Sequence, residues 1–587
     1  MAGESKGAKI KNFFGDFKDH WNTPKEGRYV PYKEYLSVFL GVGGDYALVR
    51  VLNYLSFTTG CFLVIFYYEI PVLTFSIIGA FFLVQGYFWE ILNMIISDNL
   101  GFLPKKAEKS LYALYFFFTA LGILFLVFDF SEIIPFPDKL RHYLESFPGI
   151  NMRNTLKIFA AHWIACGYGG ARAIFIRKKW LPKLGRYKLF AYPNVIPAMI
   201  FVLLICWLPL YEKPLYERVW MLHALFAFYG IFGYTNGASA ISNTISPDPH
   251  ERMLVRCYPE KLSHLFNSVV IVSVLPLLAS TFTGDITNIN TYRYIIPIMM
   301  MLCTLLLFSG LGNIKERIPQ PPVEKKKYIP FWDAIHGVLK NKYLWINAIS
   351  GLIDSLGNGS LYVKDIILIY TWRERGIIYV IVQNLVSMVG NPGAFLAPWI
   401  RKRFQYRSLI LFKRLVLAGQ CFGYICAFYF FRDNYFMSGL IMLIALCVGD
   451  MLNSAIELAD QDMGVRLRDY QMYISGERLE NYAKVVEWFT KPFTAIIGLI
   501  IPILYYKVGF TSDYDILFVD DIRSKCMMIG MAFDFVGHLL CIIPYWFFWD
   551  YTDEKHAHVI EVLEERERLA NAGATEEEIY SVGLKED

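Results

Sequence analysis

Three ionisable residues lie at helical spacing inside an apolar stretch near the C-terminus. Lys484, Glu487 and Lys491 are three and four residues apart, so a helix would place them on one face. If this helix enters a membrane, charged side chains there are costly and must face protein or water. Lys491 precedes Pro492 in mid-span, and a buried Lys needs a partner, either Glu487 or an acid from another span. We therefore interpret Lys491 as a substrate-binding candidate.

Acidic residues in other apolar stretches are candidates for binding a coupling cation. Glu90 follows a Trp, and Asn93 lies three residues further on, where it could act as a neutral ligand. Asp354 lies in a glycine-rich span and Asp450 in a later one. Carboxylates at such depths are functional candidates by default. The alternative for Glu90 is a side chain that reaches the interface or pairs with Arg172.

Two local patterns allow more than one interpretation. Asp534 and His538 are four residues apart in the last apolar stretch, which fits a proton relay because His titrates near neutrality. A buried hydrogen-bonded pair is the alternative, which we favour. The segment 390–393, Gly-Asn-Pro-Gly, interrupts a span and predicts either exposed carbonyls or a packing kink. The ten cysteines form no CxxC pair, so we expect neither a metal site nor a disulfide framework.

The composition indicates a membrane protein. The 587 residues are 55% hydrophobic and only 19% charged, whereas soluble proteins hold about 25% charged residues. Apolar runs of roughly 20 residues recur, as spanning helices require. The fourteen candidate spans are 46–68, 70–97, 110–131, 155–176, 188–210, 218–243, 262–281, 291–312, 344–370, 376–400, 407–431, 436–459, 482–507 and 524–548.

Basic residues gather in alternate loops between these spans, which predicts both termini on the cytoplasmic side of a plasma membrane. The charged tail predicts one or two solvated helices with a break near Gly573. The predicted organisation has five parts: a cytoplasmic amphipathic N-terminus (1–35), an N-terminal transmembrane bundle (36–312), a cytoplasmic linker (313–343), a C-terminal transmembrane bundle (344–549) and a cytoplasmic helical tail (550–587).

Three patches of residues carry a resemblance to a known family. They are Asp469-Tyr470 with Gly476-Glu477-Arg478 and Lys491, then Asp248-Pro249-His250-Glu251-Arg252, then Trp89-Glu90. Together they resemble the glycoside–pentoside–hexuronide:cation symporters, the melibiose-permease-like branch of the major facilitator superfamily. The resemblance implies an all-α membrane fold of two six-helix bundles that work by alternating access. The chain has about two spans beyond the family's twelve, all in its N-terminal half, for a total of 12–14.

The resemblance matches the loops better than the binding site. The family's first-span acid falls near Asn53, and its fourth-span sugar contacts fall near Asn236. The partner of the second-span acid falls on Met94. We therefore predict a substrate site with Asn53, Asn236, Lys491 and a stacking Trp488, and leave the substrate and the ion open.

Four loop residues are candidates for a cytoplasmic latch between the bundles, because rocking of two bundles needs breakable contacts. They are Asp248, Arg252, Asp469 and Arg478. The alternative is that the basic residues only set topology. The two extra spans have two conflicting assignments: an insertion at 110–176, or an N-terminal addition at 46–97. Internal echoes at offsets of 224 (Ile176 to Ile400) and 226 (Arg252 to Arg478) favour the second.

The sequence therefore predicts a secondary transporter, a symporter of a sugar, glycoside or related polar solute with H⁺ or Na⁺. The alternatives are a carrier of a lysolipid or other amphiphile, or a non-transporting membrane receptor or scaffold. We expect no enzyme activity and no cofactor, because no nucleophile motif or phosphate-binding loop is present. The expected partners are the solute and the lipid bilayer, without nucleic acid, and the expected functional unit is a monomer.

Overall fold

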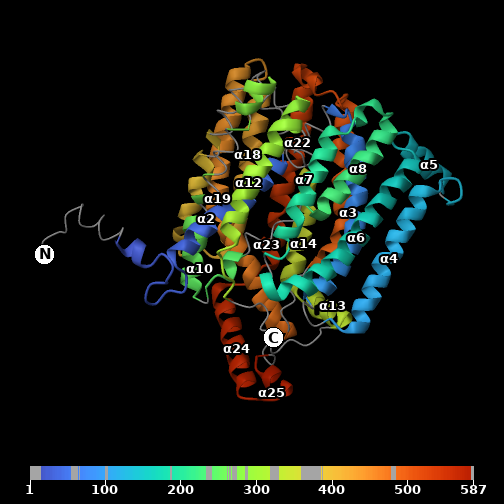
Figure 1. The fold of residues 1–587 in the computed structure, drawn as a ribbon. Coiled ribbons are helices and arrows are strands. Elements are labelled where there is room, and N and C mark those ends of the chain that lie inside the picture. Colours follow the sequence, from blue (N-terminus) through green and yellow to red (C-terminus); the bar gives the residue numbers. More distant parts are fainter. Residues whose placement is uncertain are drawn as a thin grey trace.

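A computed structural model defines the arrangement of most of the chain (Figure 1). The residues that it describes are 15–53, 64, 67–98, 103–135, 137–185, 188–232, 241–246, 248–260, 262–263, 266, 274–275, 277–284, 288–317, 330–358, 385–386, 388–476 and 484–583.

Every regular element within these ranges is a helix, which confirms the all-α prediction. The N-terminal half contains α2 (Tyr32–Asn53), α3 (Val72–Asp98), α4 (Lys105–Val127), α5 (Asp138–Glu145), α6 (Met152–Leu184), α7 (Ala191–Trp207), α8 (Leu215–Phe232), α10 (Pro249–Val255) and α12 (Ile296–Leu311). The C-terminal half contains α13 (Phe331–Leu339), α14 (Lys342–Asp354), α17 (Ala397–Arg401), α18 (Tyr406–Phe430), α19 (Tyr435–Ser475), α20 (Val485–Ile497), α21 (Ile500–Val508), α22 (Asp520–Leu540), α23 (Ile542–Phe548), α24 (Asp553–Asn571) and α25 (Glu576–Ser581).

Short 3-10 and π-helical turns lie between these helices. They are η2 (Leu210–Glu212), η3 (Ile241–Asn243), η4 (Arg256–Glu260), η5 (Ala279–Thr283), η6 (Thr291–Ile295), η7 (Ser355–Gly357), η8 (Asn391–Leu396) and η10 (Tyr514–Phe518). Several interrupt the apolar stretches. Because a broken helix leaves backbone carbonyls without intrahelical partners, these interruptions must face protein or a polar cavity inside a membrane.

Six apolar segments within the described residues are long enough to cross a membrane as helices. They are Lys105–Val127, Thr291–Leu311, Tyr406–Phe430, Tyr435–Glu457, Val485–Val508 and Asp520–Phe548. Their mean hydropathy lies between 1.5 and 2.1, so exposure of their surfaces to lipid is favourable. The chain is therefore a multi-pass membrane protein.

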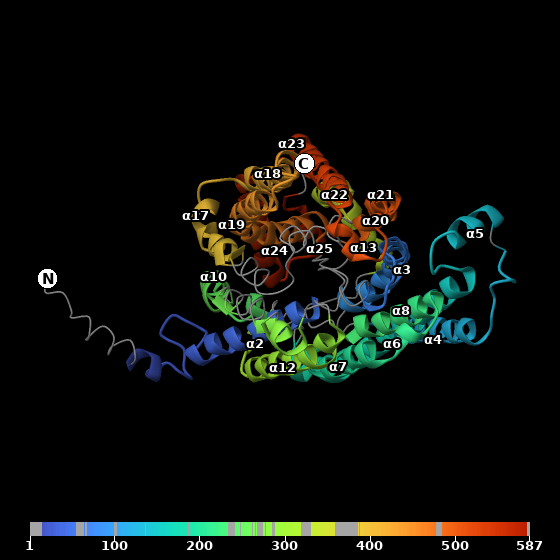
Figure 2. The same ribbon diagram turned by 90° about the horizontal axis from the view of Figure 1, so that it is seen from above.

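The helices form two groups that face each other. Viewed from above, α2, α12, α7, α6 and α4 form a row on one side, and α17, α18, α19, α22 and α23 gather on the other (Figure 2). Helix α3 lies where the groups meet and packs against α20 and α21. Helix α4 lies at the outer end of the row, beside α6. The assignment of the two extra spans stays a prediction with both alternatives open.

Small residues set the closest helix contacts in the N-terminal half. A side-chain carbon at Gly44 would lie 2.3 Å from the backbone nitrogen of Leu307, and one at Gly310 would lie 2.1 Å from that of Gly41. These glycines therefore let α2 and α12 approach backbone to backbone. In lipid, no hydrophobic driving force brings helices together, because the lipid tails are as apolar as the side chains. Helices there associate through close packing, which small residues allow.

Several helix boundaries differ from the predicted spans. Helix α2 begins at Tyr32 and not near residue 46, and α19 continues to Ser475, past the predicted end at 459. Hydropathy detects only the apolar part of a helix, so it predicts a loop at the polar extension of α19; this reason does not apply to α2, whose residues 36–44 are themselves mostly apolar. The 390–393 interruption is a packing feature, since a side-chain carbon at Gly393 would lie 2.0 Å from the carbonyl oxygen of Met451.

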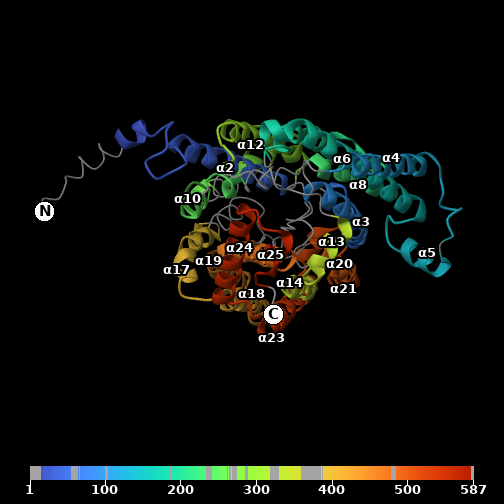
Figure 3. The same ribbon diagram turned by 90° about the horizontal axis from the view of Figure 1, so that it is seen from below.

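The C-terminal tail is docked, whereas the sequence predicted solvated helices. The break at Gly573 is present, with a φ of 83°, and α24 and α25 lie beneath the C-terminal half (Figure 3). The buried Arg566 donates hydrogen bonds to the carbonyl oxygens of Tyr473 and Val582. Asp553 forms ion pairs with Arg401 and Arg466. The charge run thus includes buried groups that hold it in place.

Candidate functional site

Three charged residues form a contact between the two halves, which we call the bridging cluster: Glu90, Glu487 and Lys491. The ammonium group of Lys491 lies 3.3 Å from Glu90 Oε2 and 3.2 Å from Glu487 Oε2. Glu90 comes from α3 and the other two from α20. The sequence predicted that Lys491 needs a carboxylate partner, either Glu487 or an acid from another span, and the structure provides both. The alternative pairing of Glu90 with Arg172 is wrong, because Arg172 donates to the Asn194 side chain and the Pro193 carbonyl.

The sequence of α20 explains how its two charges meet. Glu487 and Lys491 are one turn apart, with the acid on the N-terminal side, which is the favourable order for such a pair. Pro492 lacks a backbone N–H, so the Trp488 carbonyl loses its intrahelical hydrogen bond. Helix α20 ends at Ile497 and α21 starts at Ile500, so this span is a broken helix.

The bridging cluster contains two carboxylates and one ammonium group. With all three ionised, the formal charge of these side chains is −1, and the nearby Lys484, which acts electrostatically on Glu487, offsets part of it. Lys491 is 23% exposed and Glu487 is 47% exposed, so the cluster is open to small ions. The arrangement can therefore bind a cation in competition with Lys491.

A second group of charges lies inside the C-terminal half, and we call it the C-terminal cluster: Asp354, Arg414, Asp534 and His538. Arg414 Nη1 lies 2.9 Å from Asp354 Oδ2, and His538 Nδ1 lies 2.9 Å from Asp354 Oδ1. His538 Nε2 lies 3.3 Å from Asp534 Oδ1. The predicted pairing of Asp534 with His538 is confirmed. Helices α14, α18 and α22 are joined by this network.

The other predicted cation and substrate residues are not seen in either cluster. Asp450 lies on α19, where its Cβ would be 3.0 Å from a side-chain carbon at Gly390. Trp488 packs with the apolar residues of α13 and α14, and its buried indole nitrogen has no acceptor among the described residues. Asn53 ends α2 and Asn93 lies on α3, but their side chains are outside the described part of the chain, as is all of Asn236.

The predicted latch residues are placed only in part. Arg252 donates to the carbonyl oxygen of Ser246, and Asp248 accepts from the backbone N–H of Glu251, so both make local contacts around the start of α10. Asp469 lies inside α19, which corrects its predicted loop position. Arg478 lies outside the described residues. The latch stays a prediction.

Sequence reasoning missed the structural roles of two charged residues. Arg414 lies two turns inside α18 and binds Asp354. Its position within an apolar stretch was a usable signal, since charges there are rarely incidental. Glu251 is buried and accepts hydrogen bonds from the backbone of Tyr29 and Val30, which ties the N-terminal segment to α10. No local spacing links residues so far apart.

A family model of known proteins matches much of the chain. Residues 173–549 match the family described as MFS/sugar transport protein, where MFS is the major facilitator superfamily. This range includes Lys491, Glu487 and the whole C-terminal cluster but not Glu90. A search of curated proteins finds no match.

Two solved transporters resemble the fold at low similarity. A bacterial homologue of the human lysosomal transporter Spinster, in an inward-facing conformation, is 10% identical, with a TM-score of 0.43 over 88% of this chain and 96% of its own. The xylose transporter XylE from E. coli, in a partially occluded inward-open conformation, is 13% identical, with a TM-score of 0.43 over 82% of this chain and 98% of its own.

A multi-pass helical protein with charged residues bridging two halves has the make-up of a membrane transporter. The family match covers well over half of the chain, and the chain belongs to the MFS/sugar transport protein family.

Proposed function

We propose that this protein is a cation-coupled symporter of a sugar, glycoside or related small polar solute, and that the bridging cluster is its coupling site. The observation that carries the proposal is the contact of Lys491 with a carboxylate from each half. The family supports transport of a solute. The resemblance to the melibiose-permease-like branch supports cation coupling, because that branch is similar at the residues around Glu90 and Lys491.

The proposed coupling follows from competition for two carboxylates. When Na⁺ or H⁺ occupies Glu90 or Glu487, the attraction between Glu90 and Lys491 weakens, and the two halves lose a contact that joins them. A cation shifts a conformational equilibrium only by its differential affinity for the two states. Here that difference arises because Lys491 and the cation cannot use the same carboxylate oxygens fully at the same time.

The proposed solute site lies beside the cluster. Lys491 would donate to a solute hydroxyl once a cation has released it from Glu90. The indole nitrogen of Trp488 is a second donor with no acceptor among the described residues. Burial has already removed this N–H from water, which is unfavourable while it lacks an acceptor. A solute hydroxyl that reached it would therefore add a hydrogen bond at little further desolvation cost. Both contacts favour a polyhydroxylated solute over a purely apolar one.

We also propose a plasma-membrane location with both termini in the cytoplasm and a monomeric functional unit. Support for the orientation comes from basic segments at one end of the molecule. Lys178 at the end of α6 binds Glu108 at the start of α4, so these two basic segments lie together. The tail helix α24 binds Arg401 and Arg466. Such clustering of Lys and Arg is typical of cytoplasmic ends.

The test is uptake by purified protein in lipid vesicles with imposed gradients. A panel of radiolabelled mono- and disaccharides, with one lysophospholipid as the alternative cargo, is presented with an inward Na⁺ gradient, an inward H⁺ gradient or neither. The proposal expects at least one sugar to accumulate above equilibrium with one gradient only. Sugar uptake that responds to neither gradient contradicts symport, and uptake of the lysophospholipid alone contradicts the proposed cargo.

A further inference from the structure

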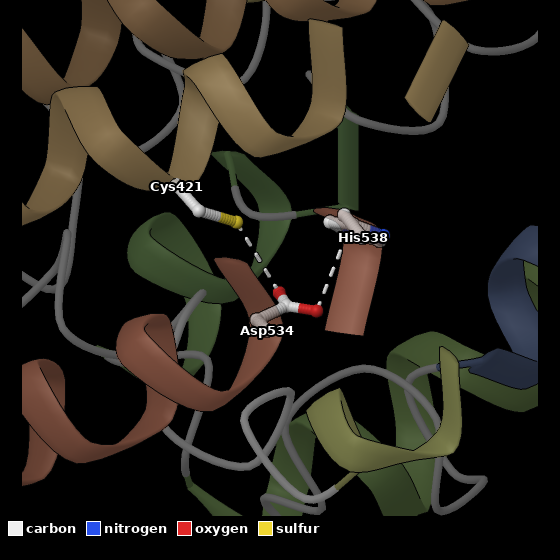
Figure 4. A group of neighbouring side chains, drawn as sticks. All are labelled: Cys421, Asp534 and His538. Carbon is white, nitrogen blue, oxygen red and sulfur yellow. Dashed lines mark hydrogen bonds and ion pairs between the residues drawn. The ribbon is translucent and has the colours of Figure 1, made fainter. Parts of the chain in front are cut away.

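The C-terminal cluster borders a thiol, and the group resembles a metal-ligand set. Cys421 on α18 faces Asp534 on α22, with Sγ 3.5 Å from Asp534 Oδ2, and His538 is one turn further along α22 (Figure 4). One ligand atom from each residue lies within 4.8 Å of the other two. Cys421 is 1% exposed, and Asp534 and His538 are nearly buried. We propose that Cys421, Asp534 and His538 bind a divalent transition-metal ion of the zinc class.

Two contacts in the group have lengths close to the ligand–ligand distances of a tetrahedral site. Bonds of 2.0–2.3 Å at tetrahedral angles place neighbouring ligand atoms about 3.3–3.5 Å apart. His538 Nε2 lies 3.3 Å from Asp534 Oδ1 and Cys421 Sγ lies 3.5 Å from Asp534 Oδ2, so the two contacts use different oxygens of one carboxylate. One ligand atom from each of the three residues lies within 4.8 Å of the other two, so side-chain rotation must shorten at least one separation to close the site. Three protein ligands leave a fourth position for water, as in open zinc sites.

A second layer of contacts orients the histidine. His538 Nδ1 lies 2.9 Å from Asp354 Oδ1; in the tautomer with the proton on Nδ1, it donates to that carboxylate and the Nε2 lone pair faces Asp534 Oδ1 at 3.3 Å. Metal-bound histidines usually donate their other N–H to a carboxylate in this way. Arg414 in turn holds Asp354 at 2.9 Å. A lone pair that faces a carboxylate needs a cation between them, either a proton or a metal ion.

Charge and space also fit a divalent ion. Asp354 and Arg414 neutralise each other. A divalent cation, the Cys421 thiolate and the Asp534 carboxylate would then also sum to zero, which suits a low-dielectric site. The sulfur, nitrogen and oxygen donors together favour Zn²⁺ or Co²⁺ over Mg²⁺ or Na⁺. Gly357 keeps the site open, because a side-chain carbon there would lie 2.1 Å from Asp534 Oδ1.

No CxxC spacing indicates this site, because its ligands come from two helices. A bound ion would link α18 to α22 within the C-terminal half. It would not touch the bridging cluster, so the inference stands or falls independently of symport.

The experiment is a Co²⁺ titration of the purified full-length chain, freed of any affinity tag, in detergent. We expect one Co²⁺ per chain, with a thiolate-to-cobalt absorption band that Zn²⁺ abolishes and Mg²⁺ does not. Cys421→Ser should remove the band and weaken binding at least tenfold, and the matched Cys426→Ser on the same helix should leave both unchanged. Asp354→Asn, which removes the carboxylate that contacts His538 and pairs with Arg414, should weaken binding roughly 10- to 100-fold.

The inference is overturned if the wild-type chain binds no stoichiometric Co²⁺, which would leave a proton as the occupant. It is also overturned if Cys421→Ser keeps the wild-type band and affinity. Should Cys421→Ser fail to fold, His538→Gln replaces it, and binding by that variant at wild-type affinity likewise overturns the inference.

Discussion

The bridging cluster and the C-terminal cluster contain similar residues, but one lies between the two halves and the other within one half. The first joins α3 to α20 across the meeting of the two halves. The second joins α14, α18 and α22 within one half. If the halves move against each other during alternating access, the first contact must break and re-form, whereas the second travels with its half. Similar ion pairs can thus serve coupling in one place and structure in the other.

Loss of the arginine from the C-terminal cluster should have the largest effect on stability. Arg414 on α18 pairs with Asp354 on α14, and Arg414→Met leaves this carboxylate without its guanidinium partner. Removing one partner of a buried pair costs about 3–5 kcal/mol, and because Asp354 is 32% exposed we expect about 2–4 kcal/mol. Thermal unfolding in detergent measures the change.

The matched double variant sharpens this prediction. Asp354→Asn combined with Arg414→Met removes both charges and should recover most of the lost stability, because neither leaves an unpaired charge. A double variant as unstable as the single one would show that Arg414 acts through packing and not through its charge.

The bridging cluster should show the opposite balance of effects. Lys491→Met removes an ion pair whose side chains are partly exposed, so the stability should fall by about 1 kcal/mol or less. Gradient-driven accumulation of the solute should fall at least tenfold, since the proposed competitor of the cation is gone. The pair of measurements is thermal unfolding and vesicle uptake. A large loss of stability with normal accumulation would reverse the assignments of the two clusters.

A charge exchange gives a smaller and more selective effect. Glu90→Lys and Lys491→Glu each place like charges next to each other and should lower accumulation. The double exchange restores an opposite pair across the halves and should recover part of it. No recovery above the single variants, measured by vesicle uptake at matched protein levels, would argue that the contact between α3 and α20 is not itself what couples transport.

The docked tail supplies the smallest predicted effect and a pH test. Burial acts to raise the pKa of Asp553, but hydrogen bonds and charges from Arg401 and Arg466 outweigh it, so its pKa is lowered. Because the pKa is lowered, ionised Asp553 stabilises docking at every pH above its undocked pKa of about 3.9. This contribution is lost only as the pH falls below that value. Spin labels at Arg403 and Asn571 should therefore report one distance from pH 5 to 8.

The matched variant for the tail is Asp553→Asn, which should broaden that distance distribution at every pH. The ion pairs are partly exposed, so the expected cost is about 1 kcal/mol or less. A distance that changes between pH 5 and 8 in the wild-type chain would show that another group controls docking.

Local spacing in the sequence was enough to predict some contacts and not others. The pairs Glu487–Lys491 and Asp534–His538 are one helical turn apart, so their contacts follow from helix geometry. Glu90 and Lys491 were each identified as candidates, but their contact depends on how α3 meets α20. Arg414 and Asp354 likewise meet only through the tertiary fold.

Hydropathy and charge patterns failed for a common physical reason. They report the average environment of a segment, so they ended α19 where its apolar residues end and assigned the tail to solvent. Helix α19 continues to Ser475 because polar residues also form helices beyond a membrane. The tail docks because the buried Arg566 finds carbonyl acceptors on Tyr473 and Val582, and no composition rule foresees such specific partners.

The most direct test compares the two clusters in one vesicle assay, with gradient-driven accumulation and solute counterflow measured side by side. Counterflow needs binding and alternating access but no cation gradient. Glu90→Gln should lose accumulation and keep counterflow, while the Asp354→Asn, Arg414→Met double variant and the exposed control Glu132→Gln should keep both. Wild-type accumulation by Glu90→Gln, or its loss in the double variant with counterflow intact, would contradict the bridging cluster as the coupling site.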